Sequence, residues 1–308
     1  MLFLGIDGGG TKTKVFVIDE NKTVIYEGES GPSSIDTVEA SVTLKNINNC
    51  LVDFFKNPEY KNKTFSSVFA GLGGVPDELA QEVLKSIIIK VDGVTKDSLV
   101  FARSDMENAL ASGLCFDEGI TLIAGTGMVA FGKTKDGKTH RAGGLGYKEG
   151  DFGSSYSLGL MAIQMVARTL DFRYPKTPFT IELSEYLNLN TPADVARLAE
   201  DWHTERTKVA SLAPFVTKHA NFGDNLATKI CDKMSYELAI AVRAIYETLK
   251  IKKPTLVVVG SLGNVRGYFK DKLHEQILAF APDINIISPK VDPAHAAALL
   301  AHKYYYNK

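Results

Sequence analysis

The sequence predicts an α/β fold made of two related lobes. Its 308 residues exceed the size at which a single hydrophobic core usually stops growing, which favours two domains. Short apolar runs rich in β-branched residues alternate with long stretches of helical periodicity, and this mixture is typical of α/β proteins. A pattern of strand, Gly/Thr-rich turn, strand and polar turn opens the chain and recurs near residue 120, so the two lobes are expected to be related.

The first lobe is expected to combine short strands with two helices. Apolar, β-branched runs bounded by turn residues mark the strands, and apolar side chains at helical spacing, such as Ile47, Leu51 and Phe55, mark the helices. The predicted strands are 2–6, 14–18, 23–26, 67–72 and 99–102, and the predicted helices are 38–56 and 76–89.

The second lobe is expected to repeat the opening hairpin and then to become mostly helical. The predicted strands are 120–124, 128–131, 255–259 and 284–287, and the predicted helices are 154–170, 192–200, a long region over 205–250 broken near 222–224, and 293–305. The last helix is rich in alanine and is expected to pack back onto the first lobe. We therefore expect one lobe of residues 1–115 with 293–308, and a second lobe of residues 116–292.

Composition argues against several classes of protein. Hydrophobic residues make up 45% and charged residues 23% of the chain, as in ordinary globular proteins. The net charge of −1 offers no electrostatic attraction to nucleic acid or to an anionic membrane. The three cysteines are scattered and the six histidines show no metal-ligand spacing, which argues against a disulfide or zinc framework. With no signal-peptide pattern and no apolar run of about eighteen residues, we expect a cytoplasmic protein that does not enter a membrane.

A glycine-rich turn follows the first strand. It consists of Asp7, Gly8, Gly9, Gly10, Thr11, Lys12 and Thr13. Glycines let a phosphate approach the backbone, successive N–H groups form an anion-binding concavity, and the threonines add hydroxyl donors. Asp7 lies at the strand end, where a carboxylate can hold Mg²⁺ directly or through water. The P-loop pattern fails because Thr11 separates Gly10 from Lys12, and G-x-G-x-x-G fails because a strand follows.

Two further turns could complete a nucleotide site. The first consists of Gly125, Thr126 and Gly127, which occupy in the second hairpin the place that the glycine-rich turn occupies in the first. The second contains Gly260, Ser261 and Gly263. It follows an apolar strand, and its open backbone suits a flat ligand such as adenine or ribose. Taken alone, either turn is also consistent with an ordinary chain reversal.

Two acidic residues are candidates for direct contact with a substrate. Asp105 follows a strand and precedes a helical run. It is therefore either the N-cap of that helix or a general base that accepts a hydroxyl proton. Asp151 lies in a glycine-dense segment that ends at an apolar helix. It either binds sugar hydroxyls or belongs to the capped start of that helix.

Taken in order, these motifs resemble the N-acetylglucosamine kinase branch of the superfamily of sugar kinases, heat-shock ATPases and actin, which also contains the BadF/BadG-type ATPases. The likeness runs from Gly5 to the final helix, and its most specific parts are residues 4–13 and 150–154. The resemblance implies two ribonuclease-H-like lobes around an ATP/sugar cleft, as in the actin-like ATPase fold. It also implies ATP and Mg²⁺ as cofactors and a small-molecule sugar as the substrate.

The resemblance further implies roles for individual residues. The first turn and the turn at 125–127 bind the ATP phosphates, the turn at 260–263 lies by the adenosine, and Asp105 is the catalytic base. The residues implied to touch the sugar are Ser34, Asp36, Asp105, Thr126, Gly144, Leu145, Gly146 and Asp151. Two departures concern the identity of the sugar. Ser34 and Asp36 follow the early loop where the family usually carries an Asn, and Phe152 stands where members often have an acid.

The leading hypothesis is phosphoryl transfer from MgATP to a hydroxyl, with O6 preferred, of N-acetylglucosamine, N-acetylmuramic acid or glucosamine. The alternative is a BadF-type ATPase that activates a partner enzyme. Related activators hold an iron–sulfur cluster on cysteines near the phosphate loops, whereas Met128, Val129 and Ala130 follow the second turn here. A sugar-sensing repressor is a third interpretation. Repressors of a neighbouring kinase-like family carry an N-terminal pair of DNA-binding helices and a cysteine zinc motif, whereas this sequence opens with the predicted phosphate-binding strand and shows neither. A homodimer remains open, since residues 304–306 could pack at a subunit contact or on their own lobe.

Overall fold

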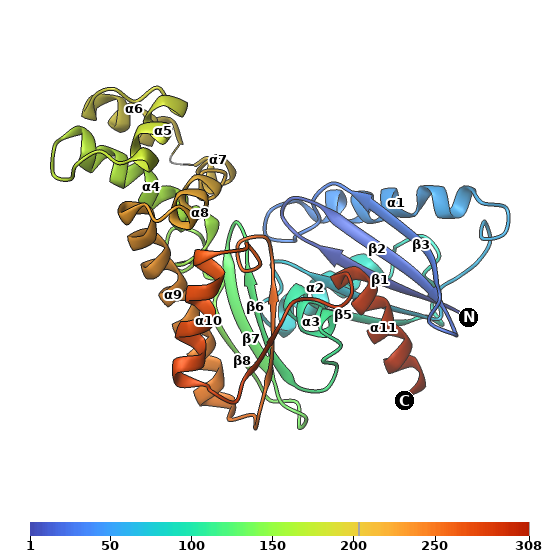
Figure 1. Cartoon of the computed structure of the whole chain (residues 1–308). Helices are drawn as coiled ribbons and strands as arrows, with labels where there is room; N and C mark the ends of the chain where they lie inside the picture. The colour runs from blue at the N-terminus through green and yellow to red at the C-terminus, as the bar shows by residue number, and fades with distance from the viewer. Residues whose placement is uncertain (203, 308) are drawn as a thin grey trace. The chain divides into compact units, whose positions relative to one another are not determined.

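The computed structural model describes residues 1–202 and 204–307, and it divides the chain into two compact units (Figure 1). Unit 1 comprises residues 1–116 together with the C-terminal residues from Pro289 onward, and unit 2 comprises residues 117–288. Each unit is built on a five-stranded mixed sheet covered by helices.

The sheet of unit 1 has the strand order β3-β2-β1-β4-β5. Its strands are β1 (Leu2–Gly8), β2 (Thr13–Asp19), β3 (Val24–Ser30), β4 (Ser67–Leu72) and β5 (Leu99–Ser104). The first three strands form an antiparallel meander, whereas β4 and β5 run parallel to β1. The carboxyl ends of β1, β4 and β5 therefore meet at one edge of the sheet.

Both faces of this sheet are buried under helices. The helices of unit 1 are α1 (Ala40–Lys56), α2 (Glu78–Ile88), α3 (Asp105–Ser112) and α11 (Pro293–Tyr306). Leu4 and Ile6 of β1 pack with α1 and α2 on one face, while Phe3 packs with α3 and α11 on the other. This division follows from the strand period of two, which sends alternate side chains to opposite faces.

The C-terminal helix α11 lies unusually close to the central strand. A Cβ added at Gly5 of β1 would come within 2.2 Å of backbone atoms of Ala294 and Ala298. Glycine on the strand and alanines on the helix thus permit a backbone approach that larger side chains would block. In the structure, the last helix packs on the sheet of unit 1.

The sheet of unit 2 repeats the arrangement of unit 1, with the order β10-β9-β6-β7-β8. Its strands are β6 (Gly119–Ala124), β7 (Met128–Lys133), β8 (Thr139–Gly143), β9 (Thr255–Val259) and β10 (Asn285–Ile287). Again three strands form an antiparallel meander, while β9 runs parallel to β6 and β10 runs parallel to β9. The weak repeat in the sequence therefore corresponds to a repeated sheet topology, and the predicted α/β class is confirmed.

Unit 2 carries more helix than unit 1. Its helices are α4 (Ser155–Leu170), α5 (Pro178–Tyr186), α6 (Pro192–Trp202), α7 (Arg206–Ala210), α8 (Ala213–Asn221), α9 (Asn225–Leu249) and α10 (Tyr268–Phe280). The long helical region is indeed interrupted near Gly223, where φ is +78°, but a further break separates α7 from α8. The sequence prediction omitted β8, α5 and α10.

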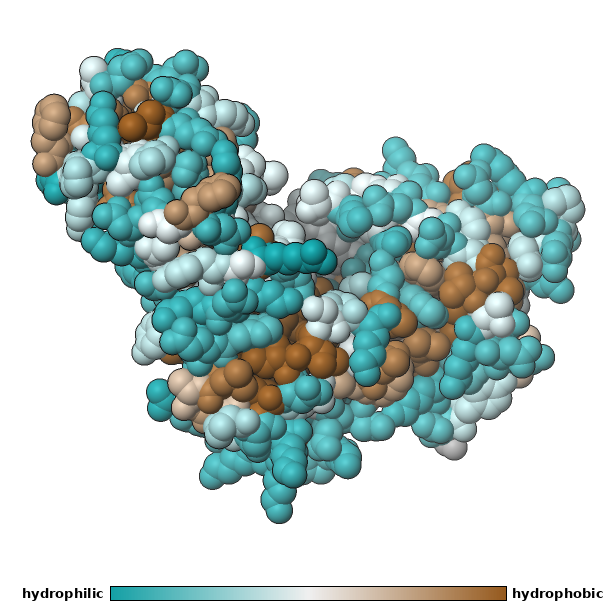
Figure 2. Space-filling model, viewed as in Figure 1, coloured by the Kyte–Doolittle hydropathy of each residue, from teal (hydrophilic) through white to brown (hydrophobic). Residues whose placement is uncertain are grey.

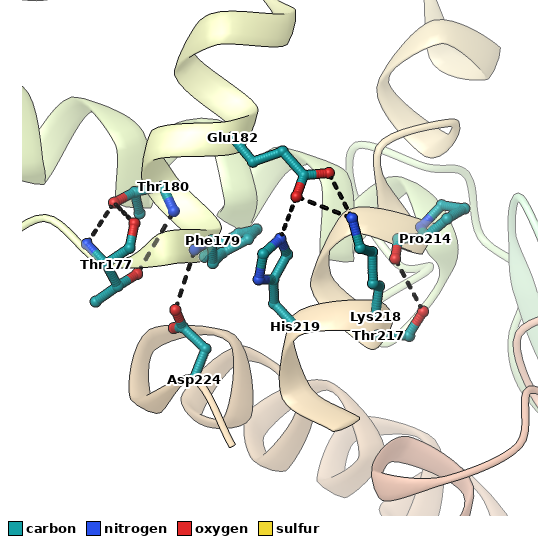
Figure 3. A network of polar contacts seen from close by, with 9 residues as sticks. All are labelled: Thr177, Phe179, Thr180, Glu182, Pro214, Thr217, Lys218, His219 and Asp224. Carbon is teal, nitrogen blue, oxygen red and sulfur yellow. Dashed lines mark hydrogen bonds and ion pairs between the residues drawn. The ribbon is translucent and has the colours of Figure 1, made fainter. Parts of the chain in front are cut away.

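A polar network joins α5 to α8 and α9 (Figure 3). Asp224 caps α9 by accepting from the backbone N–H groups of Leu226 and Ala227, and its other oxygen accepts from the N–H of Phe179 at 3.1 Å. Glu182 of α5 pairs with Lys218 and His219 of α8 at 2.7 and 2.9 Å. The helical part of unit 2 is thereby held by directional contacts as well as by its apolar core.

Hydrophilic residues cover most of the face drawn in Figure 2, where brown apolar patches interrupt the teal surface. In the described ranges, no helix is both long and apolar enough to cross a bilayer.

Candidate functional site

In unit 1, the predicted site residues gather at the carboxyl edge of the sheet. Asp7 of β1 pairs in register with Gly71 of β4, which pairs with Arg103 of β5. Asp105 directly follows β5 as the first residue of α3. Asp7 and Asp105 thus lie near the same edge, which is where open α/β sheets bind their ligands.

The glycine-rich turn is closed by a hydrogen bond from the N–H of Gly9 to the carbonyl of Lys12 at 2.9 Å. Gly8 is required by the fold, because a Cβ there would lie 2.1 Å from Oγ of Ser33. Gly9 and Gly10 are different. A Cβ would find its nearest neighbours at 3.9 and 3.6 Å, and neither residue has the positive φ that favours glycine. The fold itself therefore gives no reason for glycine at positions 9 and 10.

The three residues that complete this turn point in different directions. Thr11 is exposed, and Lys12 is an exposed side chain paired with Glu29 at 2.8 Å. Thr13 is fully buried, and its hydroxyl donates to the carbonyl of Gly31 at 2.7 Å. Thr13 thus anchors the turn, while Thr11 is accessible from solvent.

The carboxyl group of Asp7 lies deep among neighbouring atoms, although part of the residue surface reaches solvent. This desolvation raises the pKa of Asp7 to about 7, and the nearby carboxylates of Asp105 and Asp292 add to the rise. Asn108 opposes it by donating to Oδ1 of Asp7 at 2.8 Å. A buried carboxylate surrounded by like charges favours binding of a proton or a cation.

Asn108 is a site residue that the sequence analysis missed. Its side chain is fully buried on α3 and donates to the carbonyls of Ile6 and Gly71 at 3.0 and 3.1 Å, as well as to Asp7. It therefore ties the ends of β1 and β4 together and orients the Asp7 carboxylate. The only sequence signal was an amide directly before the short apolar run of residues 109–111.

Asp105 is not the N-cap of α3. Ser104 occupies that position and accepts from the N–H of Met106 at 3.4 Å, while its own hydroxyl donates to Oδ1 of Asp105 at 3.1 Å. The capping alternative for Asp105 is therefore wrong, and the general-base alternative stays a prediction.

The segment with Ser34 and Asp36 lies against the glycine-rich turn. The N–H groups of Ser33 and Ser34 donate to the carbonyl of Gly9 at 3.1 and 3.2 Å. The hydroxyl of Ser34 donates to Oδ1 of Asp36, and Asp36 is an exposed residue. Ser34 and Asp36 are thus adjacent to the predicted phosphate turn.

In unit 2, the two predicted nucleotide turns are neighbours. The turn at 125–127 joins β6 to β7 and is closed by a bond from the N–H of Gly125 to the carbonyl of Gly127 at 2.9 Å. The N–H of Gly263 donates to the carbonyl of Ala124, immediately before this turn, at 3.2 Å. Gly260 needs its glycine for the fold, because φ is +98° and a Cβ would lie 2.3 Å from the Ala124 carbonyl. At Gly125, by contrast, a Cβ would meet no atom within 4 Å and φ is not positive.

The glycine-dense segment before α4 buries a carboxylate. Gly144 and Gly146 adopt positive φ values of +68° and +107°, which bend the chain back on itself. The backbone N–H of Asp151 donates to the carbonyl of Gly146 at 3.0 Å, and the residue is 4% exposed. Burial raises the pKa of Asp151, against the field of Arg206. Ser154 is the N-cap of α4, so capping does not explain Asp151.

Repeated strand topology and glycine turns at the carboxyl edges define the class of protein as the two-lobed, actin-like ATPase and sugar-kinase fold. The chain belongs to the BadF/BadG/BcrA/BcrD ATPase family, whose model matches residues 4–301. The resemblance inferred from the motifs is confirmed.

Full-length relatives and a solved structure agree with this assignment. The chain is 28% identical over 300 residues to the N-acetylmuramic acid/N-acetylglucosamine kinase of Clostridium acetobutylicum. It is also 28% identical over 317 residues to the N-acetyl-D-glucosamine kinase of Dictyostelium discoideum, and both alignments cover 97% of each chain. A Chromobacterium violaceum structure described as a candidate N-acetylglucosamine kinase shares the fold, with a TM-score of 0.75 and 21% identity over 97% of this chain and 98% of that one.

Proposed function

We propose that the protein is an ATP-dependent kinase that transfers the γ-phosphoryl group of MgATP to a hydroxyl, with O6 preferred, of an amino sugar. The observation that carries the proposal is the set of glycines that the fold does not require, Gly9, Gly10 and Gly125, in turns at the carboxyl edges of the two sheets. A glycine kept without structural need suits a backbone that a phosphate must approach. The names of the full-length relatives support the sugar class.

In this proposal, the turns at positions 8–11 and 125–127 bind the phosphates through backbone N–H groups other than those of Gly9 and Gly125, which close the turns. Thr11 and Thr126 add hydroxyl donors. Gly260, Ser261 and Gly263 lie along the adenosine. Asp7 holds Mg²⁺, directly or through water. Its desolvated carboxylate and the neighbouring acidic groups suit a hard divalent cation that replaces the proton favoured at low pH. Bound Mg²⁺ neutralises charge on the transferring phosphoryl group.

Asp105 is proposed as the base that orients the sugar hydroxyl and accepts its proton. The hydrogen bond from Ser104 fixes one of its oxygens. Asp151 and the backbone of residues 144–146 bind other hydroxyls of the sugar, together with Ser34 and Asp36. N-acetylglucosamine, N-acetylmuramic acid and glucosamine are the candidate substrates. We propose that the enzyme works in the cytoplasm, because MgATP is available there.

The test is ADP release from ATP and Mg²⁺ in the presence of each candidate sugar, of N-acetylmannosamine and of glucose, with a sugar-free control. Release that depends on an amino sugar is the expected result. Release without any sugar, or none with any, would instead favour an ATPase that activates a partner enzyme. Iron in the anaerobically purified protein would support that alternative, although burial raises the pKa of both the Cys50 and Cys231 thiols to about 12, which disfavours cluster ligation.

A further inference from the structure

An arginine that no motif marks reaches the proposed sugar site of unit 2. Arg206 is the first residue of α7, and its Nη2 pairs with Oδ2 of Asp151 at 3.3 Å. A Cβ added at Gly127 would lie 2.2 Å from the same Nη2 and 2.6 Å from Oδ2 of Asp151. Three segments that are far apart in sequence thus converge on one point beside the second phosphate turn.

The Asp151–Arg206 pair leaves hydrogen-bonding capacity unused. Oδ1 of Asp151 and Nε of Arg206 are both buried, and neither has a partner among the residues that the structure describes. Asp151 is 4% exposed as a whole. Each buried polar atom left unpaired costs about 1–3 kcal/mol, so native proteins seldom tolerate two on one ion pair. An acceptor and a donor side by side are what a bound ligand would satisfy.

We infer that Arg206 is a further sugar-binding residue: its Nε–H donates to an uncharged hydroxyl or amide group of the sugar, beside Oδ1 of Asp151, the acceptor that the proposed function already assigns. The inference rests on the proposed sugar-kinase function. A hydroxyl or an acetamido group both donates and accepts, so it matches the pair. A carboxylate would be repelled by Asp151 and an ammonium group by Arg206.

The surrounding contacts hold the pair in place before a ligand arrives. The carbonyl of Asp151 accepts from the N–H of Ser154 and from the hydroxyl of Ser157, at 3.2 and 3.0 Å. The guanidinium of Arg206 lies over the ring of Tyr147, with Cζ 5.6 Å from the ring centroid. Glycine at position 127 leaves room for the guanidinium. Such preorganisation lowers the entropic cost of binding.

The test compares the wild-type enzyme with Arg206→Ala, Arg206→Lys and the control Arg243→Ala. Arg243 forms an exposed ion pair with Glu247 at 2.7 Å on α9, so its loss removes a similar charge from the same unit without touching the site. The kcat and the KM for both substrates are measured with the sugar that supports ADP release. If the wild type uses no sugar, the proposed function fails. Arg206 is judged only where sugar-dependent activity exists.

Arg206→Ala is expected to raise the KM for the sugar about 10–100-fold, the effect of losing one charge-assisted hydrogen bond. The KM for ATP should stay within about twofold of the wild-type value. The sugar KM of Arg206→Lys should lie between those of the wild type and Arg206→Ala, because lysine keeps the charge but lacks the planar set of N–H donors of the guanidinium group. Arg243→Ala should match the wild type. A lower sugar KM in Arg206→Ala would mean that the arginine occupies the place of the ligand, and an unchanged one would mean a structural role; either overturns the inference.

A pH profile separates a ligand contact from simple loss of structure. Burial raises the pKa of Asp151, and the positive charge of Arg206 is the main influence that opposes this rise. In Arg206→Ala the pKa of Asp151 rises further, so the acidic limb of kcat/KM should move to higher pH. An acidic limb that stays at the wild-type pH in Arg206→Ala would contradict the inference. The melting temperatures of all variants show whether each one is folded.

Discussion

Replacing Gly9 with alanine separates what the fold needs from what the ligand needs. The new Cβ would lie 3.9 Å from its nearest neighbour, the carbonyl oxygen of Lys12, and the backbone has no positive φ to strain. A compatible Gly→Ala change usually adds about 0.4–1 kcal/mol to stability by restricting the unfolded chain. The variant should therefore melt at or slightly above the wild-type temperature.

The same methyl group stands where a phosphate must approach the turn. Losing one hydrogen bond between an N–H and a charged phosphate costs about 1.5–3 kcal/mol, which corresponds to a KM for ATP roughly 10–150-fold higher. Thermal unfolding and steady-state kinetics measure the two effects. Gly125→Ala should show the same two effects as Gly9→Ala, unchanged or slightly higher stability and a higher KM for ATP, since its Cβ would meet nothing within 4 Å.

Gly137→Ala is the matched control. A Cβ at Gly137 also meets nothing within 4 Å, but φ there is +83°. Alanine in this conformation costs about 1–2 kcal/mol, so the control should lose stability and keep its KM for ATP. Wild-type ATP kinetics in Gly9→Ala and Gly125→Ala would refute the reasoning that these glycines are kept for a phosphate.

Three further predictions concern single residues of unit 1. Asp105→Asn should fold normally and lose on the order of 10²–10⁴ in kcat, the usual contribution of a positioned base; near-normal turnover would remove Asp105 from the mechanism. Gly5→Ala should lower stability by about 1–3 kcal/mol, since its Cβ would lie within 2.2 Å of the α11 backbone; calorimetry that shows no loss would contradict this packing. Because the pKa of Asp7 is raised to about 7 in the folded state, its contribution to stability is present at low pH and is lost as the pH rises through about 7. Metal-free Asp7→Asn should therefore unfold at a less pH-dependent temperature between about pH 4 and 7, and an unchanged pH dependence would rule out this titration.

Much of the fold could be predicted because most of its strands have a recognisable local sequence pattern. Both opening hairpins combine apolar, β-branched strands with glycine turns, and the repeat of this pattern corresponds to the repeated sheet order. β8 was missed because residues 139–143 carry no apolar alternation and are a strand only through pairing with β7. In α10, the buried Phe269, Leu273 and Ile277 do show helical spacing, so that signal was available.

The candidate site was predictable where glycines and strand-end acids mark it, and unpredictable where tertiary contacts create it. Asp105 shows the limit of local reasoning, because only the structure shows that Ser104 caps α3, which removes the capping interpretation and leaves the general base as a prediction. Asn108 contacts Asp7, 101 residues earlier in the sequence, and Gly71, 37 residues earlier. Arg206 meets Asp151 only because α7 packs near α4 in the folded unit. No spacing rule connects such pairs.

The most direct test of the central claim is the identity of the product. The enzyme is incubated with MgATP and N-acetylglucosamine, N-acetylmuramic acid or glucosamine, and the sugar is analysed by mass spectrometry and ³¹P NMR, with Asp105→Asn as the inactive control. The account predicts a sugar monophosphate, carrying the phosphate on O6, formed in equal amount to ADP. ADP formed together with free inorganic phosphate and unmodified sugar would contradict it.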